Sequence, residues 1–278
     1  MARSFVRDLN THNKLVIHTA KKISKNKILL KILNYKYISP FVGIFFCWFF
    51  FLTKKNIAYI NYLPLWNSIL FIFLPPKTTF GPITGGANYV RSEQFFIRKY
   101  IFPILYKISE FFLNLRNINI VFSTDLLQSQ ISKKTKKKSL FNYVFKLISV
   151  KKKREKTIDF LIYHRNHYNK KQFFPYDLVG KLVTLNFKVH IIGDHLNNRS
   201  VVNHGFVNNK KVESLMEKTH YSLVSNENIY GLFTIECINN HVRLIMEQKS
   251  KSQVKYFKEN FIFIHFDKIE DIKKLKNF

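Results

Sequence analysis

The chain has 278 residues, enough for two ordinary domains, and 46% of them are hydrophobic, which excludes wholesale disorder. Its formal net charge of +29 at pH 7 would suit a polyanion, but lysine supplies 37 of the 46 basic residues and arginine only 9. Proteins that read nucleic acids rely on arginine, which binds phosphate and guanine bidentately. A nucleic-acid partner is therefore not expected, and the charge favours an anionic membrane surface as the partner.

The first half of the chain has an irregular α/β pattern. Its N-terminus, MARSFVRDLNTHNK, is polar and lacks the early apolar core of a secretory signal. Short β-rich runs predict strands, and apolar residues at helical spacing predict helices. Strands are expected at 13–18, 56–61, 77–80 and 119–122, and helices at 23–33, 66–74 and 95–115.

One apolar run, FVGIFFCWFFFL at 41–52, is followed directly by Lys54 and Lys55. It is shorter than the roughly 20 residues that a membrane-spanning helix needs. Two interpretations stay open: a buried strand or helix, or a patch that rests on a membrane with its lysines toward the lipid headgroups. Cys47 in this run and the distant Cys237 show no metal-ligand spacing, so we expect two buried thiols in a reducing compartment.

Two lysine-rich runs mark the middle of the chain. KKTKKK at 133–138 and KKKREK at 151–156 flank an apolar-periodic stretch at 140–150. Such runs are usually solvated, so we expect an interdomain connection between residues 130 and 156 and domains at 1–150 and 151–278.

The second half alternates strands and helices regularly. Strands are expected at 157–163, 187–192, 201–206, 221–224 and 242–246, with helices at 175–186, 210–219 and 231–240. This rhythm predicts a parallel sheet covered on both faces, in which ligands bind beyond the carboxyl ends of the strands.

The stretch SNENIYGLFTIECINNH at 225–241 follows an expected strand and opens a helix. The first amides of a helix beginning near Gly231 would bind an anion, and a phosphate could approach the glycine closely. Glu236 would accept hydrogen bonds from paired hydroxyls, as acidic residues do with ribose, and Glu227 could receive those of a sugar. The alternative is a capping loop with a surface carboxylate.

A second group of residues, YHRNHYNKK at 163–171, leaves the first strand of this half. Arg165 and Lys170 would neutralise a diphosphate there, the arginine bidentately and the lysine as a point charge. A solvated basic loop is the alternative. His164 and His167 have no cysteine or carboxylate partner at metal-ligand spacing, so no zinc site is expected.

Two glycine-containing stretches complete the pattern. In VVNHGFV at 201–207, Gly205 would let the chain turn past a flat base, and GPITGG at 81–86 would hold the backbone against a substrate. The second matches neither the phosphate-binding P-loop nor the G-x-G-x-x-G spacing, so alone it is a weak signal.

The order of these pieces across residues 157–247 resembles the donor-binding half of GT-B glycosyltransferases of the family-4, "group 1" type. GPITGG and the nearby NYLPLW at 61–66 look like the glycine loop that such enzymes present to their interdomain cleft. The resemblance implies an α/β, GT-B-like fold of two Rossmann-like domains with parallel sheets facing a cleft. Residues 1–150 would form the acceptor-side domain and 151–278 the nucleotide-sugar domain.

The resemblance also implies roles for individual residues. Glu227, Arg165 and Lys170 would be catalytic, with Glu227 on the donor sugar and the two basic residues on its diphosphate. The other donor-binding residues would be Glu236, Gly231, Asn228, Leu232, Gly205, Val207 and Gly193. The acceptor loop would comprise Gly81, Thr84, Gly85 and Gly86. Neither half contains an Asp-x-Asp sequence, so no metal and no cofactor besides the nucleoside-diphosphate-sugar substrate are expected.

The chain departs from the family pattern at three places. Eight residues separate Glu227 from Glu236, one more than in the family. Asn240-His241-Val242 stands where the family has Gly-x-Pro after the helix. The chain begins with a segment resembling the family's first helix, so we expect the first strand of the N-terminal domain to be missing.

The function expected from this resemblance is metal-independent, hexosyltransferase-like transfer of a sugar to a glycan or lipid-linked acceptor in cell-surface polysaccharide synthesis, such as lipopolysaccharide or capsule. The expected location is cytoplasmic, with peripheral contact to the inner face of an anionic cytoplasmic membrane. The alternative is a non-catalytic binder of nucleotide-sugar or anionic polymer, derived from a truncated transferase.

Overall fold

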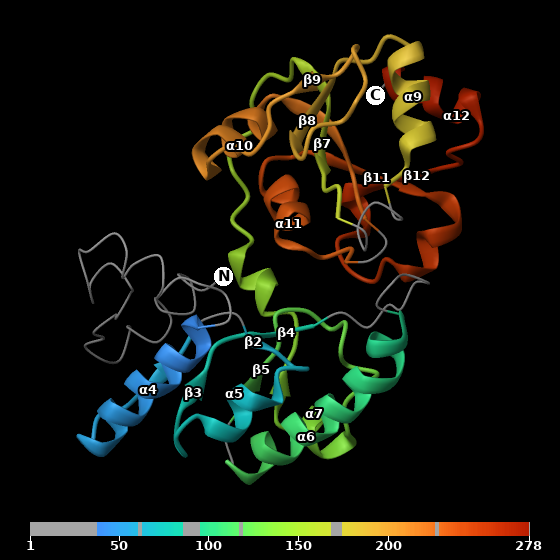
Figure 1. The fold of residues 1–278 in the computed structure, drawn as a ribbon. Coiled ribbons are helices and arrows are strands. Elements are labelled where there is room, and N and C mark those ends of the chain that lie inside the picture. Colours follow the sequence, from blue (N-terminus) through green and yellow to red (C-terminus); the bar gives the residue numbers. More distant parts are fainter. Residues whose placement is uncertain are drawn as a thin grey trace. The chain divides into compact units, whose positions relative to one another are not determined.

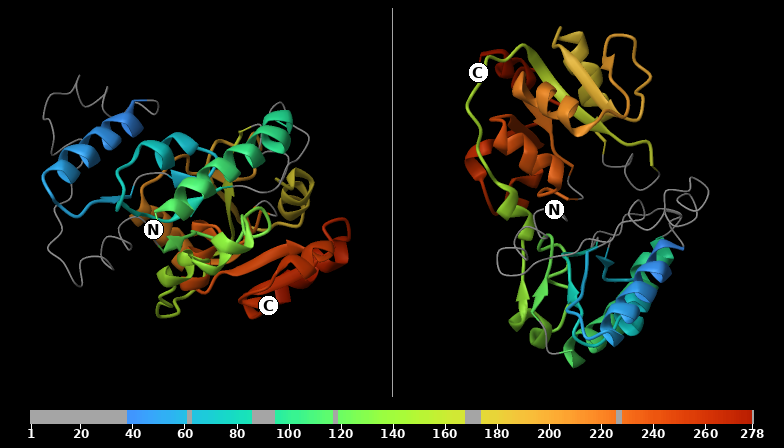
Figure 2. Two further views of the ribbon diagram at one scale, coloured as in Figure 1. Left: turned by 90° about the horizontal axis from the view of Figure 1, so that it is seen from below. Right: turned by 90° about the vertical axis from the view of Figure 1, so that its left-hand side faces the viewer.

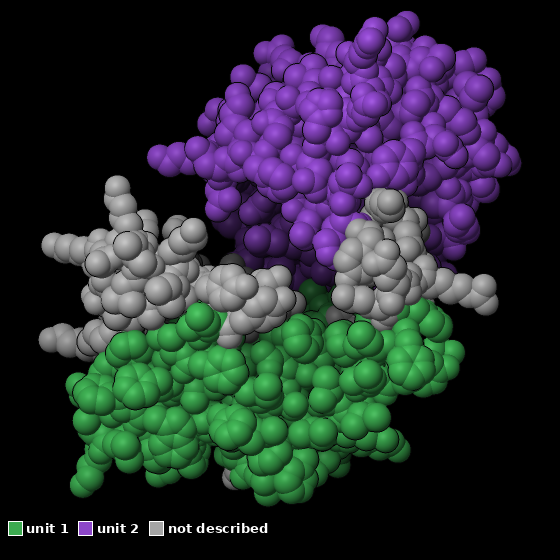
Figure 3. All heavy atoms as spheres, viewed as in Figure 1, with its two compact units in different colours: residues 1–143 green, residues 144–278 purple. Residues whose placement is uncertain are grey.

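The computed structural model describes residues 38–60, 63–85, 95–116, 119–167, 174–225 and 228–277. The chain divides into two compact units, residues 1–143 and 144–278 (Figures 1 and 3). The strand expected at 13–18 and the helix expected at 23–33 lie outside the described residues. Both units combine helices with parallel strand pairs, so the expected α/β class is confirmed.

Unit 1 contains short strands that pair in parallel: β1 with β3, β2 with β4, and β5 with β6. A further bridge joins Ile83 to Phe122, just after β5. A side chain at Gly81, between β3 and β4, would meet the Ile60 backbone at 3.1 Å, so the glycine permits this close approach. The strands are β1 (Ala58–Tyr59), β2 (Leu63–Pro64), β3 (Thr79–Phe80), β4 (Ile83–Thr84), β5 (Ile120–Val121) and β6 (Ser139–Leu140).

The helices of unit 1 pack on a core that includes Leu63, Leu70, Phe71 and Tyr106. In Figure 2, α4 and α6 lie on the same side of the short strands. The Arg116 guanidinium closes the end of α5 by donating to the carbonyls of Pro75, Phe71 (2.8 Å) and Leu74 (2.5 Å). The helices are α4 (Ser39–Leu52), α5 (Ser68–Phe73), the π-helical turn η1 (Ile97–Ile101), α6 (Phe102–Leu115) and α7 (Lys133–Lys137).

The apolar run at 41–52 forms helix α4, but the interpretation that it is buried is wrong. Cys47 is the one buried residue of α4, and Phe45 keeps 67% of its surface exposed. None of the described helices combines the length and the apolar character that crossing a membrane requires. Both cysteines are buried as expected, and burial raises the pKa of the Cys47 thiol to about 11 and that of Cys237 to about 12.

The lysine run at 133–138 forms helix α7 of unit 1, whereas the sequence placed it in an interdomain connection. Ser132 caps α7 by accepting a hydrogen bond from the Thr135 amide at 3.3 Å, and Thr135 is buried. The chain then forms β6 and enters unit 2 through the 3₁₀ turn η2 (Tyr143–Leu147). The cap and the buried threonine hold these lysines on a helix whose charged side chains face water.

Unit 2 is built on a six-stranded parallel sheet with the order β12-β11-β10-β7-β8-β9. Numbered along the chain this order is 3-2-1-4-5-6 from the β9 edge, which characterises doubly wound, Rossmann-type sheets. Its first five strands lie close to the predicted positions, although β9 is shorter, and β12 was not predicted. The strands are β7 (Ile158–His164), β8 (Val189–Gly193), β9 (Val202–Asn203), β10 (Thr219–Leu223), β11 (Arg243–Glu247) and β12 (Phe261–Ile264).

Helices cover both faces of this sheet, as expected. Figure 1 shows α10 and α11 on one face and α9 and α12 on the other. The face under α9 and α12 buries a cluster that includes Phe160, Ile162, Leu182 and Ile272. The helices are α9 (Tyr176–Thr184), α10 (Asn209–Glu217), α11 (Leu232–Asn239) and α12 (Ile269–Lys273), with 3₁₀ turns η3 (Gln248–Gln253), η4 (Lys258–Asn260) and η5 (Lys274–Asn277).

Candidate functional site

A cavity of about 570 Å³ lies at the carboxyl edge of the sheet in unit 2. The ends of β7, β8 and β10 and the start of α11 line it. β7 and β10 are hydrogen-bonded neighbours. β8 and β9 extend the sheet on the β7 side, and β11 and β12 extend it on the β10 side. The cavity therefore occupies the point at which the strand order reverses, where doubly wound sheets bind their ligands.

The cavity brings together most of the described residues that the sequence marked in this unit. It is lined by Arg165, Gly193, Val207, Asn228, Gly231, Leu232 and Glu236. Gly205 is not among its lining residues, but it lies beside them, because its carbonyl accepts the Gly193 amide at 2.9 Å. Glu227 and Lys170 lie outside the described residues.

The loop that carries Arg165 is held by Asp194. This carboxylate follows β8 and accepts the Asn166 amide at 2.8 Å, while the Asp194 amide donates to the His164 carbonyl at 3.0 Å. The buried His164 ring lies 2.9 Å from the Asp194 carbonyl and 3.1 Å from the Tyr176 hydroxyl. The exposed Arg165 guanidinium makes no hydrogen bond or ion pair with the described residues.

Gly193 is required where β7 and β8 end together. Its φ of +97° lies in the region that favours glycine, and an added Cβ would lie 2.3 Å from the His164 carbonyl oxygen. A larger residue would separate the strand ends and displace the Asp194 contacts. The sequence placed Gly193 near a donor, and the structure shows that its backbone also shapes the wall of the cavity.

The start of α11 offers hydrogen-bond donors to the cavity. Gly231 is its N-cap, and the first amides of a helix have no intrahelical acceptor. The side-chain oxygen of Asn228, in the loop before the helix, is buried and has no partner among the described residues. The start of α11 therefore supplies amide donors to one wall of the cavity, with a buried asparagine oxygen in the loop before the helix.

Glu236 lies one turn into α11 and is partly buried. Burial raises the pKa of its carboxyl group, and the nearby Lys151 opposes that shift. Its carboxylate has no hydrogen-bond partner within the described part of the chain. A partly desolvated, unpaired carboxylate is suited to accept hydrogen bonds from the hydroxyls of a ligand.

Aromatic rings form another part of the lining, and sequence reasoning missed them. Tyr163 and Phe233 pack with ring centroids 5.6 Å apart. Phe206 lines the cavity yet exposes 77% of its surface. Its position between Gly205 and Val207 was the available signal, because both neighbours had been placed near a base. A flat exposed ring offers a stacking surface for a planar group.

The glycine loop predicted to face the acceptor belongs to unit 1. Gly81 is buried behind β3, and Thr84 ends β4 with its hydroxyl buried and without a described partner. A side chain at Gly85 would meet Leu127 at 2.6 Å. Gly86 lies outside the described residues.

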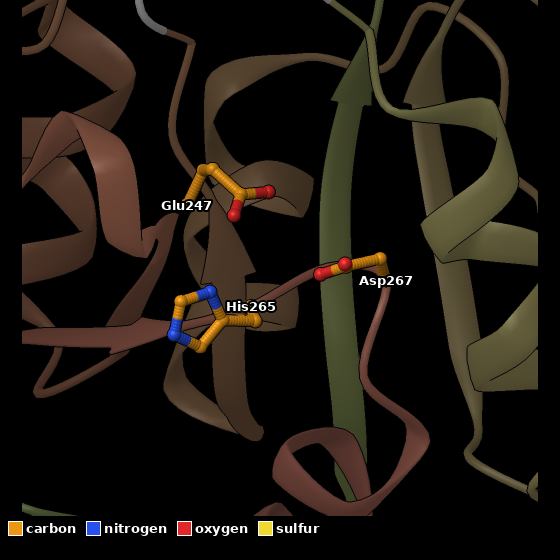
Figure 4. Close-up of side chains that lie close together, drawn as sticks. All are labelled: Glu247, His265 and Asp267. Carbon is orange, nitrogen blue, oxygen red and sulfur yellow. The ribbon is translucent and has the colours of Figure 1, made fainter.

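A separate group of potential metal ligands lies at the ends of β11 and β12. One ligand atom each from Glu247, His265 and Asp267 lies within 4.8 Å of the other two, and Figure 4 shows the Asp267 carboxylate directed toward its neighbours. The Phe266 amide already donates to Glu247 at 3.3 Å. None of the three residues lines the cavity.

No protein-family model and no curated protein sequence matches this chain.

Proposed function

We propose that this protein is a glycosyltransferase of the GT-B type, in which unit 2 binds a nucleoside-diphosphate-sugar and unit 1 receives the acceptor. The observation that carries the proposal is the cavity at the strand-order reversal of unit 2. Around one space lie the start of α11 and the side chains of Arg165 and Glu236, neither of which has a hydrogen-bond partner among the described residues. Cation, anion and amide donors are the groups that a nucleoside diphosphate requires.

The nucleoside half would lie against Glu236 and Phe206. The Glu236 carboxylate would accept hydrogen bonds from the ribose hydroxyls. Phe206 would stack on the base, with Gly205 and Val207 beside it. Because burial raises the pKa of Glu236, a bound pair of hydroxyls would restore the solvation that the carboxylate loses in the fold.

The diphosphate half would lie between Arg165 and the first amides of α11. During transfer the oxygen of an acceptor hydroxyl forms the new bond to the anomeric carbon, and the bond from that carbon to the diphosphate oxygen breaks. The hydroxyl proton passes to the departing diphosphate or to solvent. Arg165, the α11 amides and Lys170 would stabilise the negative charge on the departing nucleoside diphosphate, which is the electrostatic form of catalysis. Glu227 would contact the sugar. This scheme needs no divalent ion.

The acceptor side would be formed by unit 1 through Gly81, Thr84, Gly85 and Gly86. We propose a glycan or lipid-linked acceptor of cell-surface polysaccharide synthesis, and a peripheral location on the inner face of the cytoplasmic membrane. The exposed apolar helix α4 and the excess of lysine support this location.

Titration calorimetry with uridine, guanosine and thymidine diphosphate sugars tests the donor site. Arg165→Ala and Glu236→Gln each remove a charged hydrogen-bonding group, so each should weaken binding about 10- to 100-fold. Arg199→Ala and Glu259→Gln are matched controls on exposed residues outside the cavity and should leave binding unchanged.

Equal binding in the wild type and in both cavity variants would contradict the residue assignment. Release of nucleoside diphosphate in the presence of a membrane extract distinguishes a transferase from the non-catalytic alternative. A protein that binds the donor but transfers no sugar to extract or water would be a nucleotide-sugar binder.

A further inference from the structure

Unit 1 exposes an apolar face formed by the outward sides of α4, α5 and α6. On α4, the exposed fractions are 58% for Phe41, 67% for Phe45, 53% for Phe49 and 74% for Leu52. These residues recur at spacings of four, four and three and therefore lie on one side of the helix. The other side of α4 packs inward through Cys47.

Helix α6 repeats this pattern. Ile104, Ile108, Phe111 and Leu115 recur at spacings of four, three and four, and their exposed fractions are 60%, 37%, 60% and 65%. The opposite side of α6 buries Tyr106, Ser109 and Leu113. Each of these two helices thus has a buried inner side and a second apolar side that is exposed.

Helix α5 lies between the other two helices and also exposes apolar side chains. It contacts both α4 and α6, and the Trp48 indole of α4 donates to the Phe73 carbonyl at the end of α5 at 2.7 Å. Figure 1 shows the three helices side by side. Ile69 and Phe73 of α5 are themselves 43% and 55% exposed. Exposed apolar residues therefore gather on three helices that contact one another in turn, and such a concentration marks an interaction site.

The charged side chains around this face are cationic. Lys54 and Lys55 follow α4 directly, and the exposed Lys99 and Lys107 lie on η1 and α6. The acidic residue of these helices, Glu110, is buried and accepts hydrogen bonds from the Ser132 amide and hydroxyl at 2.8 and 2.9 Å. Residues 1–143 contain 22 Lys and Arg against 4 Asp and Glu, a formal net charge of +18.

We propose that the outward face of α4, α5 and α6 docks onto an anionic lipid membrane. Its aromatic and aliphatic side chains enter the boundary between headgroups and acyl chains, and the bordering lysines bind the lipid phosphates. The helices lie in the plane of the membrane, because the described helices are too short to cross it. This inference deepens the peripheral location proposed above and does not require the donor site.

The positive charge of unit 1 favours a membrane over two other occupants of this face, namely a second copy of the chain and the N-terminal residues 1–37. In a symmetric dimer each face would meet a copy of itself, which would bring the lysines of both copies together. The N-terminal residues 1–37 contain nine Lys and Arg and one Asp, so they would add positive charge to the face. An anionic membrane covers the apolar face at its acyl-chain boundary, and its headgroups neutralise the bordering lysines.

Vesicle flotation of the full chain tests the proposal. The protein should float with vesicles of phosphatidylcholine and phosphatidylglycerol, and weakly with phosphatidylcholine alone. Phe45→Glu combined with Phe49→Glu should lower partitioning at least about tenfold. Lys54→Glu combined with Lys55→Glu should weaken binding and reduce its dependence on salt. Leu140→Glu is the matched control, because Leu140 is 50% exposed in unit 1 and lies on none of these helices.

Tryptophan fluorescence gives a second readout. The chain has two tryptophans, of which Trp66 is partly buried, stacks on Phe102 and packs against the core of unit 1. A Trp66→Phe variant leaves Trp48, which is 39% exposed on α4, as the reporter. Its emission should shift to shorter wavelength on anionic vesicles, and lipids brominated on their acyl chains should quench it.

Three outcomes would overturn the inference. They are a folded protein that ignores anionic vesicles, equal partitioning of the phenylalanine variants and the wild type, and a lipid-free dimer that Phe45→Glu converts to a monomer. Circular dichroism identifies variants that fail to fold, and the Trp48 readout then tests the proposal in a chain whose α4 is unchanged. Nucleotide-sugar titration reports on unit 2 alone, so failure of the donor site and failure of membrane docking are distinguishable.

Discussion

Replacing Gly193 with alanine should destabilise unit 2 and deform the candidate site. The alanine must adopt a φ of +97°, and its Cβ would lie 2.3 Å from the His164 carbonyl oxygen. Such a backbone conformation costs about 1–3 kcal/mol, and relieving the overlap costs a similar amount. We therefore expect a loss of about 2–6 kcal/mol from the free energy of unfolding.

Gly180→Ala is the matched control because it makes the same chemical change in the same unit. Gly180 lies within α9, and an added Cβ there meets nothing within 4 Å. Alanine favours helix over glycine by up to about 1 kcal/mol, so this variant should be slightly more stable. Urea unfolding followed by circular dichroism measures both changes. Equal stability of the two variants would refute the packing account of the β7 and β8 ends.

Three further predictions concern separate parts of the fold. Arg116→Ala should lower the free energy of unfolding by about 2–3 kcal/mol, measured by urea titration, because three carbonyls around the end of α5 lose their donor. Burial lowers the pKa of His190 and His204, whose ring nitrogens lie 3.0 Å apart, below the ordinary 6.5. Their neutral forms are therefore favoured in the fold, so stability should be fully present above pH 6.5 and decline as the pH falls toward the lowered pKa values. Thermal melts of a His190→Gln, His204→Gln variant should show a smaller decline, and an unchanged pH profile would contradict this reasoning. Because burial raises the pKa of Glu236, Glu236→Gln should unfold at the same or a higher temperature than the wild type at neutral pH, and a clear loss of stability would show that the carboxylate has a structural partner.

Periodicity predicted unit 2 well because its strands and helices are regular and complete. The strand β12 was missed although FIFI is apolar, because lysine-rich turns separate it from β11 without an intervening α-helix. The exposure of α4 could not be predicted from its composition. An apolar composition suits both a buried helix and an exposed one. Which of the two forms depends on the tertiary contacts that the rest of the chain makes with the helix.

The sequence predicted those residues of the candidate site whose chemistry and position beside a strand or helix both suit a ligand. Arg165 was found because it follows a strand, and Gly231 and Glu236 because they lie at the start of a helix and one turn into it; all three line the cavity. Asp194 was missed as the group that holds the Arg165 loop, because its acceptor role depends on the pairing of β7 with β8. Phe206 was missed because an exposed aromatic ring has no periodic signal.

Titration of the wild-type protein with a nucleoside-diphosphate-sugar tests the central claim most directly. We predict one binding site per chain, with competition by the matching nucleoside diphosphate and weaker competition by the free nucleoside, since Arg165 and the α11 amides would bind the phosphates. Failure of every uridine, guanosine and thymidine diphosphate sugar to bind the folded protein would contradict the claim.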